Sequence, residues 1–101
     1  MQINVDGLAI THNPDENRFE VWIENQLSKL DYLENGHTIV MTHVGVHPDH
    51  RGQGVAAKLT EVALEYAKGK SLRVIPMCSY VAAYIRRNSQ YAELTKQRTD
   101  V

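Results

Sequence analysis

Apolar and polar residues alternate along much of the first half of the chain, which is the pattern of half-buried β-strands. The alternation is clearest at residues 18–23, where Phe19, Val21 and Ile23 occupy every second position. Shorter or less regular apolar runs predict further strands, and the run from 37 to 46 is rich in Thr, Ile and Val. The predicted strands span residues 9–12, 18–23, 27–32, 37–46 and 72–75.

Turn-forming residues separate the predicted strands and set their directions. Residues 13–17 form a turn cluster that predicts a hairpin between the first two strands. Glu34-Asn35-Gly36 is a strong turn signal before the fourth strand. Because short turns join neighbouring strands in opposite directions, the first four strands are predicted to form an antiparallel meander.

A helical period replaces the alternation after residue 54. It predicts an amphipathic helix over residues 55–68 whose apolar stripe lies on the sheet. Gly69 ends this helix, and a second helix is predicted from about residue 78 to residue 87. Strand, helix and strand in this order imply a right-handed parallel crossover between the fourth and fifth strands. The apolar stripe consists of Val55, Leu59, Val62, Ala63 and Tyr66.

Length and composition favour a single small domain over residues 1–101. The formal net charge is −1 and there is no basic run, so nucleic acid is not expected as a partner. No apolar run approaches the roughly 18 residues of a membrane span, and no signal-peptide pattern is present, so no membrane partner is expected. The single cysteine cannot form an internal disulfide and suits a reducing compartment. We therefore expect a cytoplasmic protein.

The most informative motif is Arg51-Gly52-Gln53-Gly54-Val55-Ala56, at the turn between the fourth strand and the first helix. Glycines at such a turn free backbone N–H groups, and a helix N-terminus adds unpaired donors and a positive dipole end. This combination binds phosphate. The spacing matches neither the Walker loop nor the dinucleotide-binding fingerprint. The alternative is an ordinary glycine-rich turn.

The motif also fits the pattern Arg/Gln-x-x-Gly-x-Gly/Ala at Arg51, Gly54 and Ala56. On these residues the chain resembles the small, truncated GNAT acetyltransferases over roughly residues 8–95. The resemblance implies an α/β (α+β) fold of the GNAT acyl-CoA N-acyltransferase type, with a twisted, mixed, mostly antiparallel sheet of about five strands and helices packed on it. It also implies that the fourth and fifth strands splay apart. Further matching segments are Val44-Gly45-Val46-His47-Pro48, Cys78-Ser79-Tyr80 and Tyr84-Ile85-Arg86-Arg87.

The resemblance implies acetyl-CoA as the cosubstrate and an amine, which the sequence leaves unidentified, as the acetyl acceptor. The loop would hold the pyrophosphate, and a backbone N–H near Val44 to Val46 would bond the thioester carbonyl. Gly45 suits a close backbone approach, although an isolated strand glycine is as often a bulge. The residues expected at acetyl-CoA are Val44, Gly45, Val46, Arg51, Gly52, Gln53, Gly54, Val55, Ala56, Cys78, Tyr84 and Arg87.

Two residues are candidates for catalysis. A histidine such as His43 accepts a proton near neutral pH, although a strand histidine bonded to a backbone carbonyl is the alternative. Cys78 stands at the predicted start of the second helix, where the helix dipole favours a thiolate. It is predicted to act as an acyl-accepting nucleophile, to line the pantetheine channel, or to be a buried small hydrophobe. The resemblance implies direct transfer, without an acyl-enzyme.

The resemblance also shows two departures from the family. The usual acid for the leaving thiolate is a Tyr on the second helix, and Ile85 stands at its position. Tyr80 or Tyr84 would replace it only if its hydroxyl faces the cleft. The helices that usually cover the acceptor side are missing as well.

Three histidines, His43, His47 and His50, raise the question of a metal site. No Cys pair or carboxylate lies at matching spacing, so no metal is expected. His47 and His50 are predicted to be solvent-facing loop residues flanking Pro48.

The sequence therefore favours an acetyl-CoA-dependent N-acetyltransferase. The alternatives are a non-catalytic acyl-CoA-binding module and a partner-binding domain whose glycines only form a turn. The acceptor amine and the oligomeric state stay open.

Overall fold

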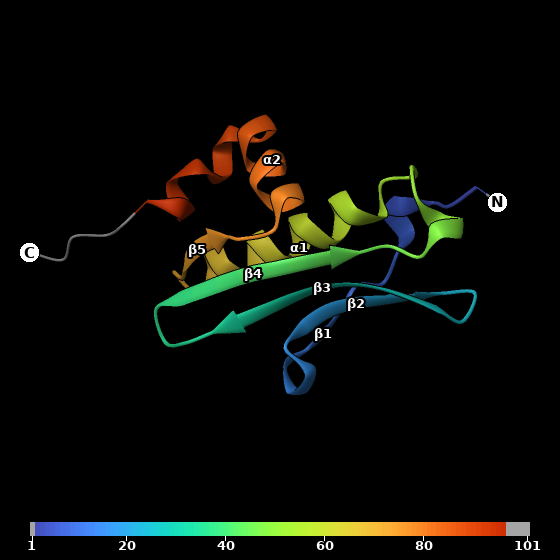
Figure 1. Ribbon diagram of the computed structural model, residues 1–101, viewed down its shortest axis with the longest axis horizontal. Helices are drawn as coiled ribbons and strands as arrows, with labels where there is room; N and C mark the ends of the chain where they lie inside the picture. The colour runs from blue at the N-terminus through green and yellow to red at the C-terminus, as the bar shows by residue number, and fades with distance from the viewer. Residues whose placement is uncertain (1, 97–101) are drawn as a thin grey trace, which may run out of the picture.

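The computed structural model describes residues 2–96 (Figure 1). The main elements are β1 (Thr11–Asn13), β2 (Arg18–Ile23), β3 (Gln26–Glu34), β4 (Thr38–Gly45), α1 (Val55–Gly69), β5 (Arg73–Pro76) and α2 (Ser79–Arg87). Short 3-10 helices are η1 (Val5–Gly7), η2 (Pro14–Glu16), η3 (Pro48–His50) and η4 (Ser89–Thr95). Every predicted strand and helix is present.

The bounds of the first strand differ from their prediction. The sequence predicts it at residues 9–12 and assigns Asn13 to the turn, but Asn13 pairs with Arg18 and belongs to β1. The turn itself is the 3-10 helix η2, in which the Asn13 side chain accepts a hydrogen bond from the Glu16 N–H. A capping side chain therefore ends the strand one residue later than composition suggests.

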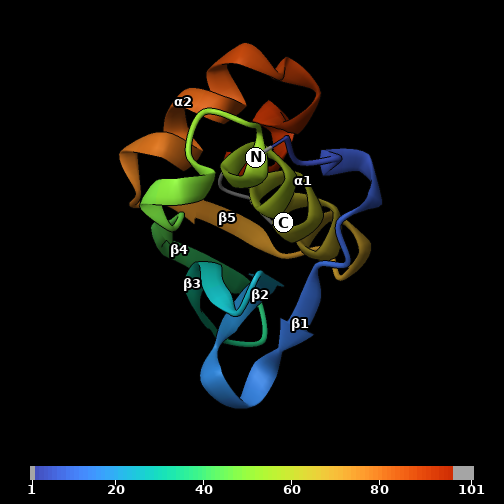
Figure 2. The same cartoon turned by 90° about the vertical axis from the view of Figure 1, so that its right-hand side faces the viewer.

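The strands form one sheet in the order β1-β2-β3-β4-β5. The first four pair antiparallel, and β4 pairs with β5 in parallel. The crossover between the two parallel strands is α1, and Figure 2 shows the sheet curving around this helix. This mixed, mostly antiparallel sheet confirms the predicted fold class.

The apolar face of α1 forms the core together with the concave face of the sheet. Leu59, Ala63 and Ala67 lie one turn apart on the helix and are fully buried. Burying one such leucine contributes about 1.5–3 kcal/mol. This packing holds the N-terminus of α1 beside the end of β4. The sheet residues of the same cluster include Phe19, Leu30, Ile39 and Met41.

Pairing between β4 and β5 stops partway along β4. The parallel register ends at Met41 and Pro76, and the Cys78 N–H then donates to the Met41 carbonyl at 3.0 Å. In the described part of the chain, β5 is the only strand on that side of β4. The edge of β4 from Thr42 to Gly45 therefore has no strand partner there, because β5 ends at Pro76. The resemblance implies that the two strands splay apart, and here the end of β5 leaves the edge of β4 open.

A β-bulge marks the start of this open edge. His43 lies opposite Asp31 and Met41 lies opposite Tyr32, so Thr42 is the extra residue. The Thr42 hydroxyl donates to the Asp31 carbonyl at 3.2 Å. A bulge bends a strand and increases its local twist, so β4 changes direction where its pairing with β5 stops.

The last elements, α2 and η4, lie beside β5 and α1 (Figure 1). The Tyr91 hydroxyl of η4 donates to the Glu65 carboxylate of α1 at 2.6 Å. Burial and this hydrogen bond raise the pKa of Tyr91, which keeps its hydroxyl protonated. No helix within residues 2–96 combines the length and the apolar character that crossing a bilayer requires.

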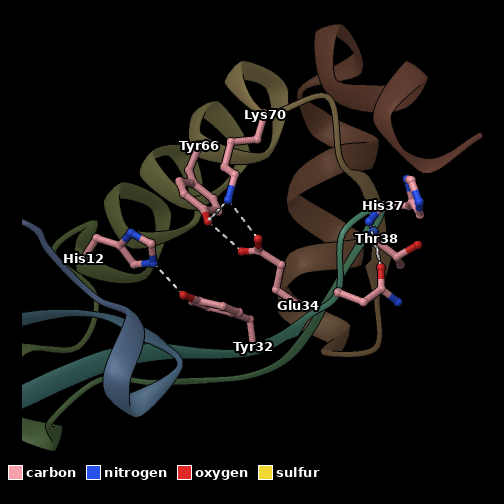
Figure 3. Close-up of polar contacts among 8 residues, drawn as sticks. His12, Tyr32, Glu34, His37, Thr38, Tyr66 and Lys70 are labelled. Atoms are coloured by element: carbon pink, nitrogen blue, oxygen red, sulfur yellow. Dashed lines mark hydrogen bonds and ion pairs between the residues drawn. The ribbon is translucent and has the colours of Figure 1, made fainter.

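A polar and aromatic cluster joins the C-terminal half of α1 to the end of β3 (Figure 3). The Tyr66 hydroxyl donates to Glu34 at 2.6 Å, and the Lys70 ammonium donates to the same carboxylate at 3.0 Å. His12 and Tyr32 are hydrogen-bonded to each other alongside (Figure 3). Burial acts to raise the pKa of Glu34, but the hydrogen bonds from Tyr66 and Lys70 outweigh it, so that the pKa is lowered.

We predict that Glu34→Gln lowers the free energy of unfolding at neutral pH, and that this difference from wild type shrinks in acid. A carboxyl whose folded-state pKa is lowered stabilises the fold above its unfolded pKa, and this contribution is lost as the pH falls through the folded-state pKa. The variant should lose about 1–2 kcal/mol at neutral pH, because glutamine keeps one acceptor oxygen but loses the other and the charge.

Urea unfolding at neutral pH and below about pH 4 measures the difference. Glu16→Gln, on an exposed residue, is the control. A difference between wild type and Glu34→Gln that stays constant across this pH range would contradict the prediction.

Candidate functional site

A cavity of about 490 Å³ lies between the open edge of β4 and the N-terminus of α1. Consecutive residues His43 to Val46 line it. Because consecutive side chains of a strand point to opposite faces, a cavity that all of them line lies against the edge of the strand. A ligand here meets the backbone of β4 as well as its side chains. The remaining lining residues are His50, Arg51, Gly52, Gly54, Val55, Ala56, Ala57 and Tyr80.

The loop before α1 has the geometry of an anion site. Gly52 and Gly54 have φ angles of 78° and 89°, in the left-handed region that favours glycine. The intrahelical bonds of α1 begin at Lys58, whose N–H donates to the Gly54 carbonyl at 3.0 Å. The N–H groups of Val55 to Ala57 therefore make no hydrogen bond within the helix. The first turn of α1 contains no acidic residue. These donors and the helix dipole favour a negative group in the cavity.

Hydrogen bonds hold the segment between β4 and this loop. The Ser28 hydroxyl of β3 accepts from the His47 N–H at 3.1 Å, and the His47 ring accepts from the Asp49 N–H at 3.2 Å. The Arg51 Nε donates to the Val46 carbonyl at 3.1 Å. Arg51 thereby lies along the cavity wall, where its charge adds to the positive potential.

The structure corrects the prediction for His50. The sequence places His50 in a solvent-facing loop, but its side chain is only 1% exposed and lines the cavity. The turn of η3 directs the ring inward, and its Nε2 lies 3.6 Å from the Glu24 carboxylate of the β2–β3 turn. Its Nδ1 is buried without a hydrogen-bond partner. His47 is half-buried and caps η3, so it too is part of the loop structure.

His43 and Gly45 lie together on one face of β4. A Cβ atom on Gly45 would lie 3.0 Å from the His43 Nε2, a distance tighter than ordinary contact. Gly45 pairs in register with Lys29, so it is not the bulge in β4. The glycine leaves space for the imidazole ring, which is exposed at the cavity.

The tyrosines of α2 divide between two cavities. Tyr80 lines the cavity at β4, whereas Tyr84 lines a neighbouring one of about 180 Å³ with Val5 and Lys58. Ile85 is buried in the core and presents no polar group. Burial raises the pKa of Tyr80, opposed by the positive charge of Arg87, so this hydroxyl is protonated at neutral pH.

Several residues expected at the ligand do not line the main cavity. Cys78 is half-buried at the N-cap of α2, and Arg87 is exposed in the last turn of that helix. The Gln53 side chain turns toward the N-terminal segment, where its Oε1 accepts from the Ile3 N–H at 2.8 Å. Within residues 2–96, no group of His, Cys, Asp or Glu is arranged to hold a metal ion.

The fold and this cavity define a class of protein: an α/β domain in which a glycine loop and the open edge of a strand lie at one cavity. A family model described as GCN5-related N-acetyl-transferase matches residues 18–94. The chain therefore belongs to the GCN5-related N-acetyltransferase family, which is the GNAT family that its sequence resembles.

A solved structure agrees with this assignment. The chain is similar to a GCN5-like candidate N-acetyltransferase from Staphylococcus aureus, whose structure was determined in solution by NMR. The two sequences are 27% identical, the match covers 92% of each chain, and the TM-score is 0.68. The similarity therefore extends over nearly the whole of both chains.

Proposed function

We propose that the protein is an acetyl-CoA-dependent N-acetyltransferase that transfers the acetyl group directly to an amine. The observation that carries the proposal is the position of the cavity, which joins the glycine loop to the unpaired edge of β4. One end offers backbone donors for a phosphate, and the other offers a strand edge for an extended, amide-containing arm.

The residues present fit acetyl-CoA, which supplies the acetyl group as an activated thioester. The N–H groups at the start of α1 hold phosphate oxygens, and Arg51 adds a positive charge beside them. The free edge of β4 near Val44 to Val46 supplies backbone groups to orient the arm. A backbone N–H there also stabilises negative charge on a carbonyl oxygen.

Proton transfer requires one base and one acid at the same cavity. His43, with its exposed ring, is proposed to accept the proton of the amine. Tyr80 is proposed to donate a proton to the departing thiolate, because its hydroxyl is protonated at neutral pH and it lines the cavity. In this assignment Tyr80 supplies the proton that Ile85, which has no polar group, is unable to donate.

A non-catalytic acyl-CoA-binding module is the second candidate function. It is favoured by the burial of Ile85 at the position of the usual acid. Both candidates require binding of acetyl-CoA, and turnover with an amine separates them.

A thermal-shift titration with acetyl-CoA, CoA, ATP and NAD tests the binding that the proposal requires. A ligand that binds only the folded state stabilises it by about 2.7 kcal/mol at one hundred times its Kd. We predict a clear rise in Tm with acetyl-CoA and with CoA, and none with NAD. Equal rises in Tm with ATP and with acetyl-CoA would indicate a general phosphate site and contradict the proposal.

We predict that Gly54→Val abolishes CoA binding. A Cβ atom at this position would lie 3.5 Å from Val5, an ordinary contact, so the effect comes from the backbone and its φ of 89°. A left-handed conformation costs an ordinary residue roughly 1–2 kcal/mol, and relieving that strain turns the loop N–H groups away from the ligand.

Gly54→Asn is the matched variant, since asparagine tolerates this conformation, and it should keep more of the affinity than Gly54→Val. Gly36→Val, at a glycine without positive φ and with open space around it, is the control. Isothermal titration calorimetry with CoA measures all three variants. If a folded Gly54→Val protein bound CoA with wild-type affinity, the loop would not be part of the binding site.

We predict that Cys78→Ala keeps sequential kinetics and changes KM by no more than about threefold. The Cys78 thiol does not line the main cavity, and the bond to Met41 uses the backbone N–H, which alanine retains. Initial-rate kinetics and mass spectrometry of the intact protein measure the outcome. An acetyl adduct on Cys78 that passes to an amine at the steady-state rate would instead establish a covalent intermediate.

A further inference from the structure

The side chain of Gln53 connects the phosphate loop to the N-terminal segment, residues 2–8. Its Oε1 accepts the Ile3 N–H at 2.8 Å, across fifty positions of sequence. Gln53 lies between Gly52 and Gly54, the two glycines of the loop that have left-handed backbone, and its side chain does not line the main cavity. The hydrogen bond therefore holds the loop from outside the main cavity.

A second contact joins the same two segments. Val5, in η1, lies against Gly54, with its Cγ2 atom 3.5 Å from the position that a Cβ there would occupy. Ile3, Val5 and Leu8 pack on the core, so the N-terminal segment is itself held in place. Figure 1 shows η1 beside the start of α1.

A loop with two left-handed glycines has many alternative conformations, because glycine loses more conformational freedom on ordering than other residues do. A ligand that needs one of these conformations binds more weakly when the loop must first be ordered. The hydrogen bond at Gln53 and the contact at Val5 reduce the number of alternatives before the ligand arrives.

We propose that Gln53 is a positioning residue which, through Ile3 and Val5, holds the loop in its phosphate-binding conformation. The proposal rests on acetyl-CoA binding as the function of this loop. It has a reciprocal consequence, because two coupled equilibria affect each other equally. If the bond to Ile3 favours the binding conformation, acetyl-CoA must strengthen that bond.

The test measures both directions of this coupling. Gln53→Met keeps the length of the side chain but removes the acceptor, and it should weaken CoA binding about threefold to tenfold, the equivalent of one hydrogen bond. Gln90→Met, on an exposed residue of η4, is the control and should bind as wild type does. Hydrogen exchange followed by NMR should show that acetyl-CoA slows exchange of the Ile3 amide in wild type but not in Gln53→Met.

Ile3→Pro removes the donor of the same bond. Combined with Gln53→Met, it should weaken CoA binding no further than the larger of the two single changes, because both remove one interaction. If Ile3→Pro does not fold, the CoA affinity of Gln53→Met and the exchange of its Ile3 amide together decide.

Faster Ile3 exchange with unchanged CoA affinity in Gln53→Met would make the bond purely structural and overturn the inference. Unchanged exchange together with unchanged affinity would do so as well. If wild type itself failed to bind acetyl-CoA or CoA, the proposed function would fail first, so the two failures are distinguishable.

Discussion

The site depends on where the backbone pairing of β4 and β5 ends. Pro76 is the last residue of β5 in the parallel register, and proline has no N–H with which to continue a ladder. The Cys78 N–H makes one more bond, to the Met41 carbonyl, and α2 then begins at Ser79. On the other strand the bulge at Thr42 bends β4 next to the last pair of this register. A proline and a bulge at the same level therefore open the space that the cavity occupies.

The same geometry brings two kinds of backbone group to one cavity. The open edge of β4 offers the hydrogen-bonding groups of a strand, and the start of α1 offers the unpaired donors of a helix. Neither needs a particular side chain, so the proposed binding of acetyl-CoA depends mainly on backbone conformation. Side-chain identity matters most at Gly52 and Gly54, whose left-handed φ angles exclude most residues, and at Gly45, which leaves room for His43.

Periodicity was sufficient to predict the meander and the crossover, because alternating and helical patterns directly reflect burial. The fold class was implied by the resemblance of the motifs to the GNAT family. The glycine loop was predictable because its conformation requires glycine at Gly52 and Gly54. Burial of His50 was not, since it depends on the turn of η3 and on Glu24, which is distant in sequence. The direction of the Gln53 side chain is also set by a distant partner, Ile3. Such long-range contacts leave no periodic signal in a single sequence.

The cluster around Glu34 bears on the site although it lies at the other end of α1. Binding through helix donors requires the helix to stay in place, because a shift of about 1 Å misaligns them. Apolar packing alone resists such sliding weakly, since it has little directional preference. The directional bonds from Tyr66 and Lys70 to Glu34, and from Tyr91 to Glu65, fix α1 along its axis. The polar contacts at one end of the helix thus maintain the position of the donors at the other.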